Sequence, residues 1–146
     1  MERTANRNFS VEYFEKGDNL WEAATQLKDD QHDIELIVEL NMAEMTVTDA
    51  RIKFNRYPVE HCPLIEKKAG QLAGLKVDHE FIRNAMKIFM GAEGCPNIMS
   101  LLHISIPGIL YFYYPYLIKT GRMKAEEFDE MVVTDLKNAC LAHTMM

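Results

Sequence analysis

The spacing of apolar and polar side chains is strand-like up to about residue 54 and helix-like beyond it. Apolar side chains alternate along residues 34–40, and Glu35 and Glu39 share the opposite face. Residues 47–54 alternate in the same way. A period of two is expected of strands that bury one face, and the short link between these segments favours an antiparallel pair.

Two earlier segments are candidates for the same sheet. Residues 9–14 are rich in aromatic and β-branched side chains, and the Lys-Gly-Asp-Asn sequence at 16–19 is a turn signal. Residues 20–27 then return as the second arm of a hairpin, although their Ala and Glu content suits a helix nearly as well. From about residue 9 to residue 54, the sequence therefore predicts an antiparallel sheet of three or four strands.

The rest of the chain, from about residue 63 to residue 143, predicts about four helices. They span residues 63–73, 79–90, 96–118 and 124–143. Asp78 is placed to cap the second helix, and the third is expected to break or bend at Pro107-Gly108 and at Pro115. Strands followed by helices indicate an α+β fold, with the helices packed on one face of the sheet.

Composition and charge narrow the class of protein. A chain of 146 residues has the length of a single domain, so we expect one domain over residues 1–146. Its 22 acidic and 16 basic residues give a formal charge of −6, which argues against a nucleic-acid partner. The first residues lack an apolar core and three cysteines make no disulfide framework, so we expect a cytoplasmic protein with reduced thiols.

Two of the cysteines stand in matching contexts. Cys62 and Cys95 each precede a proline that would open a helix, whereas Cys140 is expected inside the last helix and in the core. The unsatisfied amides and positive dipole at a helix start favour a thiolate, which both metal binding and nucleophilic chemistry require. Three interpretations stay open for the pair: half-buried structural residues, ligands of a metal or cluster, or redox or nucleophilic thiols.

Two cysteines are fewer than the four protein ligands of a closed zinc or iron–sulfur site. His61, next to Cys62, is the nearest supplement, and a homodimer would combine two pairs. The run Glu60-His61-Cys62 also invites a Cys–His–Glu nucleophile, although neighbours along a chain usually point apart. The polar run at residues 29–33 is expected to be a loop, with a divalent-cation site as its functional alternative.

With these cysteines placed, the chain resembles an uncharacterised bacterial family of domains of unknown function, from about residue 7 to residue 110. The order and spacing of the matching positions carry the resemblance. They are Arg7, Val11, Tyr13, Trp21, Leu27, Asp29, His32, Asp33, Cys62, Leu72, Gly74, Leu75, Gly94 and Cys95. The family motif Gly-Cys-Thr-His-Leu reads Gly94-Cys95-Pro96-Asn97-Ile98 here, so Asn97 replaces a histidine that would be a natural ligand or base.

A weaker resemblance is to the NifU-like iron–sulfur scaffold proteins. They share the order of an antiparallel sheet followed by helices with cysteines at the starts of two of them. The strand sequence at residues 48–53 is also similar. The scaffolds carry three cysteines and an aspartate, whereas only Cys62 and Cys95 stand in comparable places here. This likeness implies the fold more strongly than the activity.

A stretch without Asp, Glu, Lys or Arg runs from residue 94 to residue 118. Its length admits a membrane span, but its polar residues, prolines and tyrosines favour a core helix, a dimer interface or the wall of an apolar pocket. His103, Tyr111 and Tyr114 are the candidate pocket residues, with a buried, hydrogen-bonded core position as the alternative for His103. We therefore expect a homo-oligomer that does not span a membrane, with a hydrophobic small molecule as the candidate ligand.

Three functions follow from these features. The first is a small metal- or cluster-handling module that uses Cys62, Cys95 and His61 with zinc or an iron–sulfur cluster. The second is a non-enzymatic binding protein with an apolar pocket or dimer interface along residues 99–116. The third is a thiol-dependent enzyme. The sequence contains none of the common nucleotide-binding, zinc-protease or serine-hydrolase motifs.

Overall fold

The computed structural model describes residues 1–135 and 140–145, in two compact units, Met1–Pro107 and Gly108–Met146. We call these the first unit and the second unit and describe each by itself. The single domain expected over the whole chain stays a prediction.

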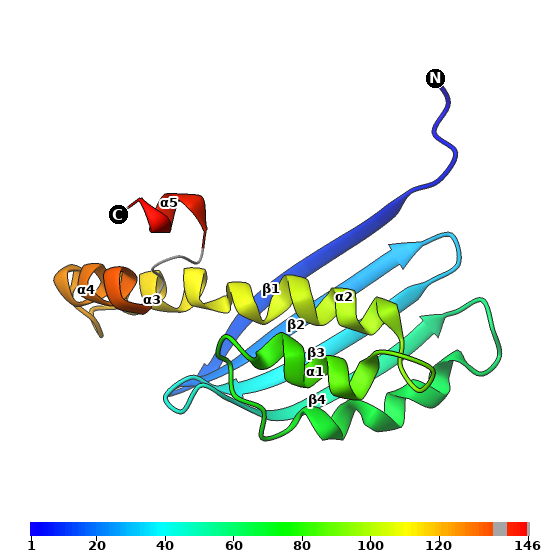
Figure 1. Cartoon of the computed structure of the whole chain (residues 1–146), viewed down its shortest axis with the longest axis horizontal. Helices are drawn as coiled ribbons and strands as arrows, with labels where there is room; N and C mark the ends of the chain where they lie inside the picture. Colours follow the sequence, from blue (N-terminus) through cyan, green and yellow to red (C-terminus); the bar gives the residue numbers. More distant parts are fainter. Residues whose placement is uncertain (136–139, 146) are drawn as a thin grey trace. The chain divides into compact units, whose positions relative to one another are not determined.

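The first unit contains a four-stranded antiparallel sheet in the order β1-β2-β3-β4 (Figure 1). The strands are β1 (Arg7–Gly17), β2 (Leu20–Asp29), β3 (Asp33–Asn41) and β4 (Thr46–Arg56). The predicted α+β class is confirmed, and the sheet has the larger of the two expected strand numbers. Residues 20–27 form a strand because their alternate positions, starting at Trp21, are buried on one face.

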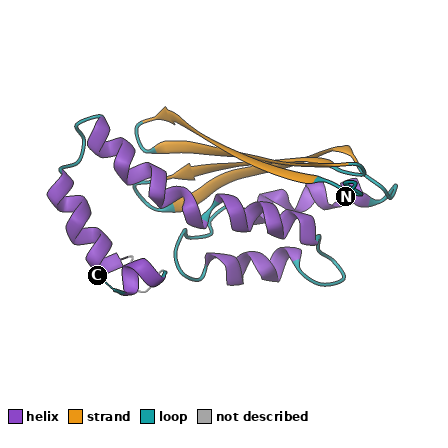
Figure 2. Ribbon diagram, turned by 90° about the horizontal axis from the view of Figure 1, so that it is seen from above, coloured by secondary structure: helices purple, strands orange, loops and turns teal. Residues whose placement is uncertain are grey.

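The 3₁₀-helix η1 (Cys62–Leu72) and the α-helix α2 (Pro96–Ser105) contact the face of the sheet that these positions share (Figure 2). The α-helix α1 (Phe81–Phe89) packs on η1 and α2. The core between sheet and helices is apolar on both sides. Its largest fully buried side chains are Leu27, Ile34, Leu36, Leu40, Met42, Leu72, Phe81, Phe89, Ile98, Leu101, Leu102 and Ile106.

Two helices of the first unit differ in detail from the prediction. The segment expected at residues 63–73 is a 3₁₀-helix with a proline in its first turn. The segment expected from residue 79 begins at Phe81, because Asp78 forms a preceding turn instead of the cap. Its carboxylate accepts the backbone N–H of Glu80 at 2.9 Å, and its carbonyl oxygen accepts that of Phe81 at 3.1 Å.

Helix α2 is joined to the edge strand β1 near both of its ends. The Tyr13 hydroxyl donates to the carbonyl oxygen of Ser105, and Arg7 Nη1 donates to Asn97 Oδ1 at 3.1 Å. Burial raises the pKa of Tyr13, so this hydroxyl keeps its proton and remains a donor. The bond to Asn97 holds the start of α2, next to Cys95, and the bond to Ser105 holds its end.

In the second unit, α3 (Leu110–Lys119) is followed by α4 (Ala125–Asp135) and α5 (Leu141–Thr144). The predicted break at Pro107-Gly108 is confirmed, since α2 ends at Ser105 and a short 3₁₀-turn, η2 (Pro107–Ile109), follows. Pro115 lies inside α3, which continues through it. A proline removes a single backbone donor, and the flanking Tyr114 packs on Tyr113 and Phe128.

The helix expected at residues 124–143 corresponds to α4 and α5, and its residues 136–139 lie outside the described residues. The expectation that Cys140 belongs to a buried helix interior is wrong. Cys140 is exposed, precedes α5, and its Sγ lies 3.4 Å from Nδ1 of His143. The prediction rested on the apolar residues earlier in the segment 124–143, whose spacing suggested one buried helix face that would include Cys140.

Candidate functional site: a charged turn and a groove with two thiols

The turn between β2 and β3 is built around the side chain of Asp29. Its Oδ1 accepts the backbone N–H of Gln31 at 2.8 Å and that of His32 at 2.6 Å. An aspartate that accepts backbone amides two and three residues further on closes a tight connection without a long loop. The loop expected at residues 29–33 is a short turn at residues 30–32, because Asp29 still belongs to β2 and Asp33 already belongs to β3.

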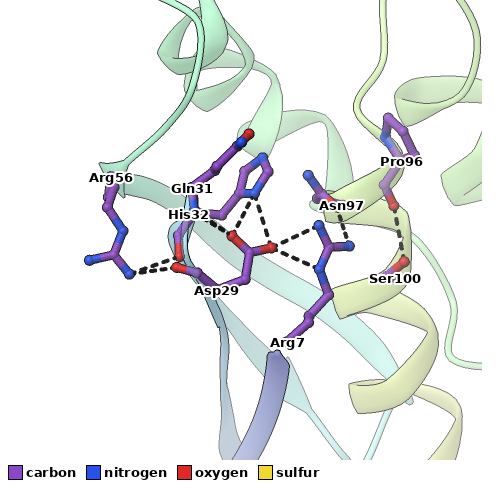
Figure 3. Close-up of polar contacts among 8 residues, drawn as sticks. All are labelled: Arg7, Asp29, Gln31, His32, Arg56, Pro96, Asn97 and Ser100. Carbon is purple, nitrogen blue, oxygen red and sulfur yellow. Dashed lines mark hydrogen bonds and ion pairs between the residues drawn. The ribbon is translucent and has the colours of Figure 1, made fainter. Parts of the chain in front are cut away.

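The same carboxylate is shared by two cationic or basic side chains (Figure 3). Arg7 lies opposite Asp29 in the β1–β2 register, and its Nε and Nη2 each lie 2.8 Å from Oδ2. On the other side, His32 Nδ1 lies 2.9 Å from Oδ1 and 3.1 Å from Oδ2. Asp29 thus fixes both the guanidinium and the imidazole.

The pKa of Asp29 is lowered from 3.8 to about 2. Desolvation by burial acts in the opposite direction and raises it, but the hydrogen bonds from Gln31, His32 and Arg7 together outweigh the burial. The carboxylate is therefore ionised at neutral pH. Because an ionised carboxylate only accepts hydrogen bonds, Nδ1 of His32 carries a proton.

Two more elements complete the cluster. From α2, Asn97 accepts the bond from Arg7 described above. From β4, Arg56 Nη2 donates to the backbone carbonyl oxygens of Asp29 at 2.7 Å and His32 at 3.3 Å (Figure 3). Side chains from β1, β4 and α2 therefore converge on one turn.

A pocket of about 450 Å³ lies beside this cluster. We call it the turn pocket. Its lining residues are Ala5, Asn6, Arg7, Asp29, Asp30, Gln31 and His32.

A second, larger hollow contains both candidate thiols. This groove has a volume of about 830 Å³ and lies between η1 and the loop that joins α1 to α2. We call it the dithiol groove. Its lining residues are His61, Cys62, Leu64, Ile65, Lys67, Lys68, Gln71, Ala92, Glu93, Gly94, Cys95 and Pro96. Cys62 and Cys95 are both free thiols and half-buried, and His61 is exposed.

Three side-chain or backbone features hold the walls of the dithiol groove. Lys68 Nζ donates to the carbonyl oxygens of Ile88 at 2.8 Å and Glu93 at 2.9 Å, which links η1 to the α1–α2 loop. Glu66 Oε1 accepts the backbone N–H of Phe54 at 2.9 Å and fixes η1 against β4. The backbone N–H of Cys95 donates to Phe89 at 2.8 Å, so the loop folds back on the end of α1.

Comparison with known proteins identifies the family of this chain. A family model described as a protein of unknown function (DUF2889) matches residues 5–107. The chain belongs to the DUF2889 family. Neither the search of curated proteins nor that of solved structures found a match. The predicted membership of a family of unknown function is confirmed, whereas the NifU-like resemblance finds no support in these comparisons.

Within this DUF2889 chain, residues that are far apart in the sequence come together in space. Arg7, Asp29 and His32 form the cluster at the turn, and Asn97 contacts Arg7. The sequence had singled out these residues one at a time. It did not predict that Arg7 and Asn97 would meet at the turn, or that Arg56 would join them.

The residues of the DUF2889 chain that the structure describes contain no group of three or more His, Cys, Asp or Glu side chains placed to hold a metal ion. His61, Cys62 and Cys95 line one groove without forming such a group. This donor set does not fit a resident zinc ion or iron–sulfur cluster with three or four protein ligands. The same finding gives no support to a divalent-cation site at residues 29–33.

The predicted pocket residues of the DUF2889 chain fall in different units. His103 is exposed on α2 in the first unit, so the buried core position considered for it is wrong. Tyr111 and Tyr114 belong to the second unit, where Tyr111 stacks on His143 and Tyr114 contacts Phe128. An apolar ligand pocket or dimer interface along residues 99–116 stays a prediction.

By length and composition alone, Pro96–Lys119 is the one helical stretch in the described residues that is apolar enough to cross a membrane, and 33% of its most apolar window is buried. Within the first unit, its α2 part packs against the sheet, with Ile98, Leu101 and Leu102 fully buried. That is the environment of a core helix in a globular domain. The expected absence of a membrane span stays a prediction.

Proposed function

We propose that this DUF2889 protein is a dithiol protein, in which Cys62 and Cys95 act together on a disulfide-containing partner in the dithiol groove. The observation behind the proposal is that two half-buried free thiols, far apart in the sequence, line the same groove. A groove of this size admits a small peptide or a low-molecular-weight disulfide. The cytoplasmic location expected from the sequence fits this chemistry, because thiols are kept reduced there.

The reaction has two steps. One cysteine thiolate attacks a sulfur of the partner disulfide, which forms a mixed disulfide and releases the first partner thiol. The second cysteine then attacks the protein sulfur of that mixed disulfide, which forms the Cys62–Cys95 disulfide and releases the second partner thiol. The two protein thiols are oxidised, and one partner disulfide is reduced to two thiols.

Cys95 is the better candidate for the attacking thiol. It is the residue before the first turn of α2, a regular α-helix, and the electropositive start of such a helix stabilises a negative charge. Cys62 starts a 3₁₀-helix, in which the hydrogen bonds are less well aligned. Lys67 also lines the groove and adds a positive charge to its wall.

The test uses the full chain carrying Cys140→Ser, which removes the exposed third thiol. Reaction with oxidised glutathione, followed by intact-mass measurement, is expected to yield a protein without adduct that has lost two hydrogen atoms. Adding Cys62→Ser is expected to leave one stable glutathione adduct on Cys95, because no second thiol resolves it.

Two results would contradict the proposal. One is a product in which Cys62 and Cys95 each keep a glutathione adduct, which would show that they react independently. The other is equal adduct formation in the Cys62→Ser and parent proteins. Binding of a thiophilic metal ion by the same two thiols without any disulfide exchange would replace the proposal with the metal-handling alternative.

A further inference from the structure

The turn pocket is separate from the dithiol groove and is lined by different side chains. It combines an anchored guanidinium, an imidazole with an open ring nitrogen and a hollow of about 450 Å³ in the first unit. We propose that the turn pocket binds a small carboxylate between Arg7 and His32, and that His32 takes up a proton when the carboxylate binds. This proposal does not depend on the dithiol chemistry.

Arg7 keeps donors for a ligand. Of the five N–H donors of a guanidinium, Nε and one on Nη2 are used by Asp29, and one on Nη1 is used by Asn97. Within the described residues this leaves one donor on each terminal nitrogen. A guanidinium that keeps a donor on each terminal nitrogen can form charge-assisted hydrogen bonds to a carboxylate.

The position of Arg7 is set before any ligand binds. Its side chain keeps 43% of its surface exposed, yet it is held from two sides by Asp29 and Asn97 (Figure 3). A long side chain that is already ordered loses little further conformational entropy on binding. The site is thus preorganised around its cation.

His32 is the second side chain proposed to contact the carboxylate, and its protonation couples binding to pH. Its Nδ1 is occupied by Asp29, and its Nε2 has no hydrogen-bond partner among the described residues. When His32 is neutral, Nε2 presents a lone pair, which repels a carboxylate oxygen. When His32 is protonated, Nε2 presents an N–H donor, so carboxylate binding and proton uptake favour each other.

The charges around His32 fit a monoanion that binds together with a proton. Asp29 from β2 and Arg7 from β1 neutralise each other, and Arg56 from β4 lies on the backbone of the turn. Asp30 is exposed at the tip of the turn and lines the pocket, so it opposes an anion. Protonation of His32 offsets the charge of the incoming carboxylate, and replacing Asp30 is expected to tighten binding.

The experiment is an NMR titration of the full chain with sodium acetate, which reads the His32 ring signals at about pH 5.5 and about pH 8. These values lie on either side of the range in which a histidine usually loses its proton. Acetate is expected to shift the His32 signals in a saturable way and to bind about tenfold more weakly at the higher pH. Asp30→Asn is expected to bind acetate more tightly than the parent chain.

The variant Arg7→Gln is expected to weaken acetate binding about tenfold or more. Arg7→Lys is expected to restore only part of the lost affinity, because a lysine ammonium lacks the planar set of donors of a guanidinium. Arg51→Gln is the matched control, since it removes the same charge from an exposed position on β4. Equal affinity in Arg7→Gln and Arg51→Gln would overturn the proposal. Acetate binding that is unchanged between the two pH values would overturn it as well.

Discussion

Asp29 has the largest share of polar contacts among the residues of the turn. Its two oxygens accept from Arg7, from His32 and from two backbone amides, and its side chain is only 12% exposed. Hydrogen bonds to a charged group contribute more to stability than neutral ones, and losing them from a largely buried side chain is costly. The ionised carboxylate of Asp29 therefore closes the turn between β2 and β3, and it also holds Arg7 and His32 at the turn pocket.

We predict that Asp29→Asn lowers the free energy of unfolding by about 2 kcal/mol at neutral pH, because the amide keeps the shape but loses the charge. Urea denaturation monitored by Trp21 fluorescence measures this, with Asp30→Asn as a control at an exposed neighbouring position. Equal stability of the two variants would contradict the structural role of Asp29.

The pH dependence follows from the lowered pKa of Asp29, about 2 in the folded chain against an ordinary value of 3.8. A carboxyl group whose pKa is depressed by folding contributes stability that is fully present above about pH 4 and is lost as the pH falls toward 2. The difference in unfolding free energy between the parent chain and Asp29→Asn is therefore expected to shrink below about pH 4. A difference that stays constant down to about pH 2.5 would contradict the assigned pKa shift.

At the scale of elements, the loop between α1 and α2 decides where Cys95 lies. A Cβ atom on Gly94 would stand 1.8 Å from the backbone oxygen of Phe89 and 2.1 Å from its carbonyl carbon. The position requires glycine because the loop folds directly over the end of α1. Gly94 therefore allows the close approach that brings the start of α2 to the groove.

We predict that Gly94→Ala destabilises the chain by about 3 kcal/mol, since backbone atoms have to move to admit the methyl group. It is also expected to change the reactivity of Cys95 more than that of Cys62. Thermal denaturation and thiol-labelling rates measure the two effects. Gly70→Ala is the control, because a Cβ there has no atom within 4 Å and the substitution is expected to be neutral. Similar results for both variants would contradict the close approach of the loop to α1.

The strands and helices of the first unit could be predicted where the apolar side chains of a segment recur with one clear spacing. The alternation in β3 and β4 identified them as strands, and proline and glycine identified the interruption after α2. The choice between strand and helix at residues 20–27 could not be made locally, because Ala and Glu favour a helix and only pairing with β1 and β3 overrides them.

The candidate site was predictable only in parts. Arg7 lies opposite Asp29 only because the register shifts by one residue between Glu15 and Gly17, so counting back from the turn at residues 16–19 does not give this pair. Asn97 and Arg56 had no signal in the sequence, because their positions depend on how α2 and β4 pack. Cys62 and Cys95 line one groove as free thiols, and among the described residues they form no metal-ligand group with a third side chain.

At the scale of the whole molecule, the family match and the first unit nearly coincide. The match covers residues 5–107, and the first unit is Met1–Pro107. Both candidate sites lie inside this unit, and so does most of the buried apolar core. The sheet and the helices that cover it therefore have the features of a self-sufficient folding unit.

We predict that a fragment of residues 1–107 folds on its own and keeps the sheet, since a domain with its own core can fold alone. Circular dichroism and a cooperative denaturation transition are the measurements. The Trp21 emission of the fragment is expected to match that of the full chain, because Trp21 is buried in the first unit. A fragment without a cooperative transition would show that the second unit is needed for folding.

The most direct test of the dithiol proposal is the equilibrium between the Cys62–Cys95 disulfide and glutathione. The full chain with Cys140→Ser is equilibrated in a series of glutathione redox buffers, quenched with acid and analysed by intact mass and peptide mapping. The account predicts one transition from the free dithiol to an intramolecular Cys62–Cys95 disulfide, with little mixed disulfide at any ratio, because the two thiols share one groove. Mixed disulfides that build up separately on Cys62 and Cys95, with no bond between them, would contradict it.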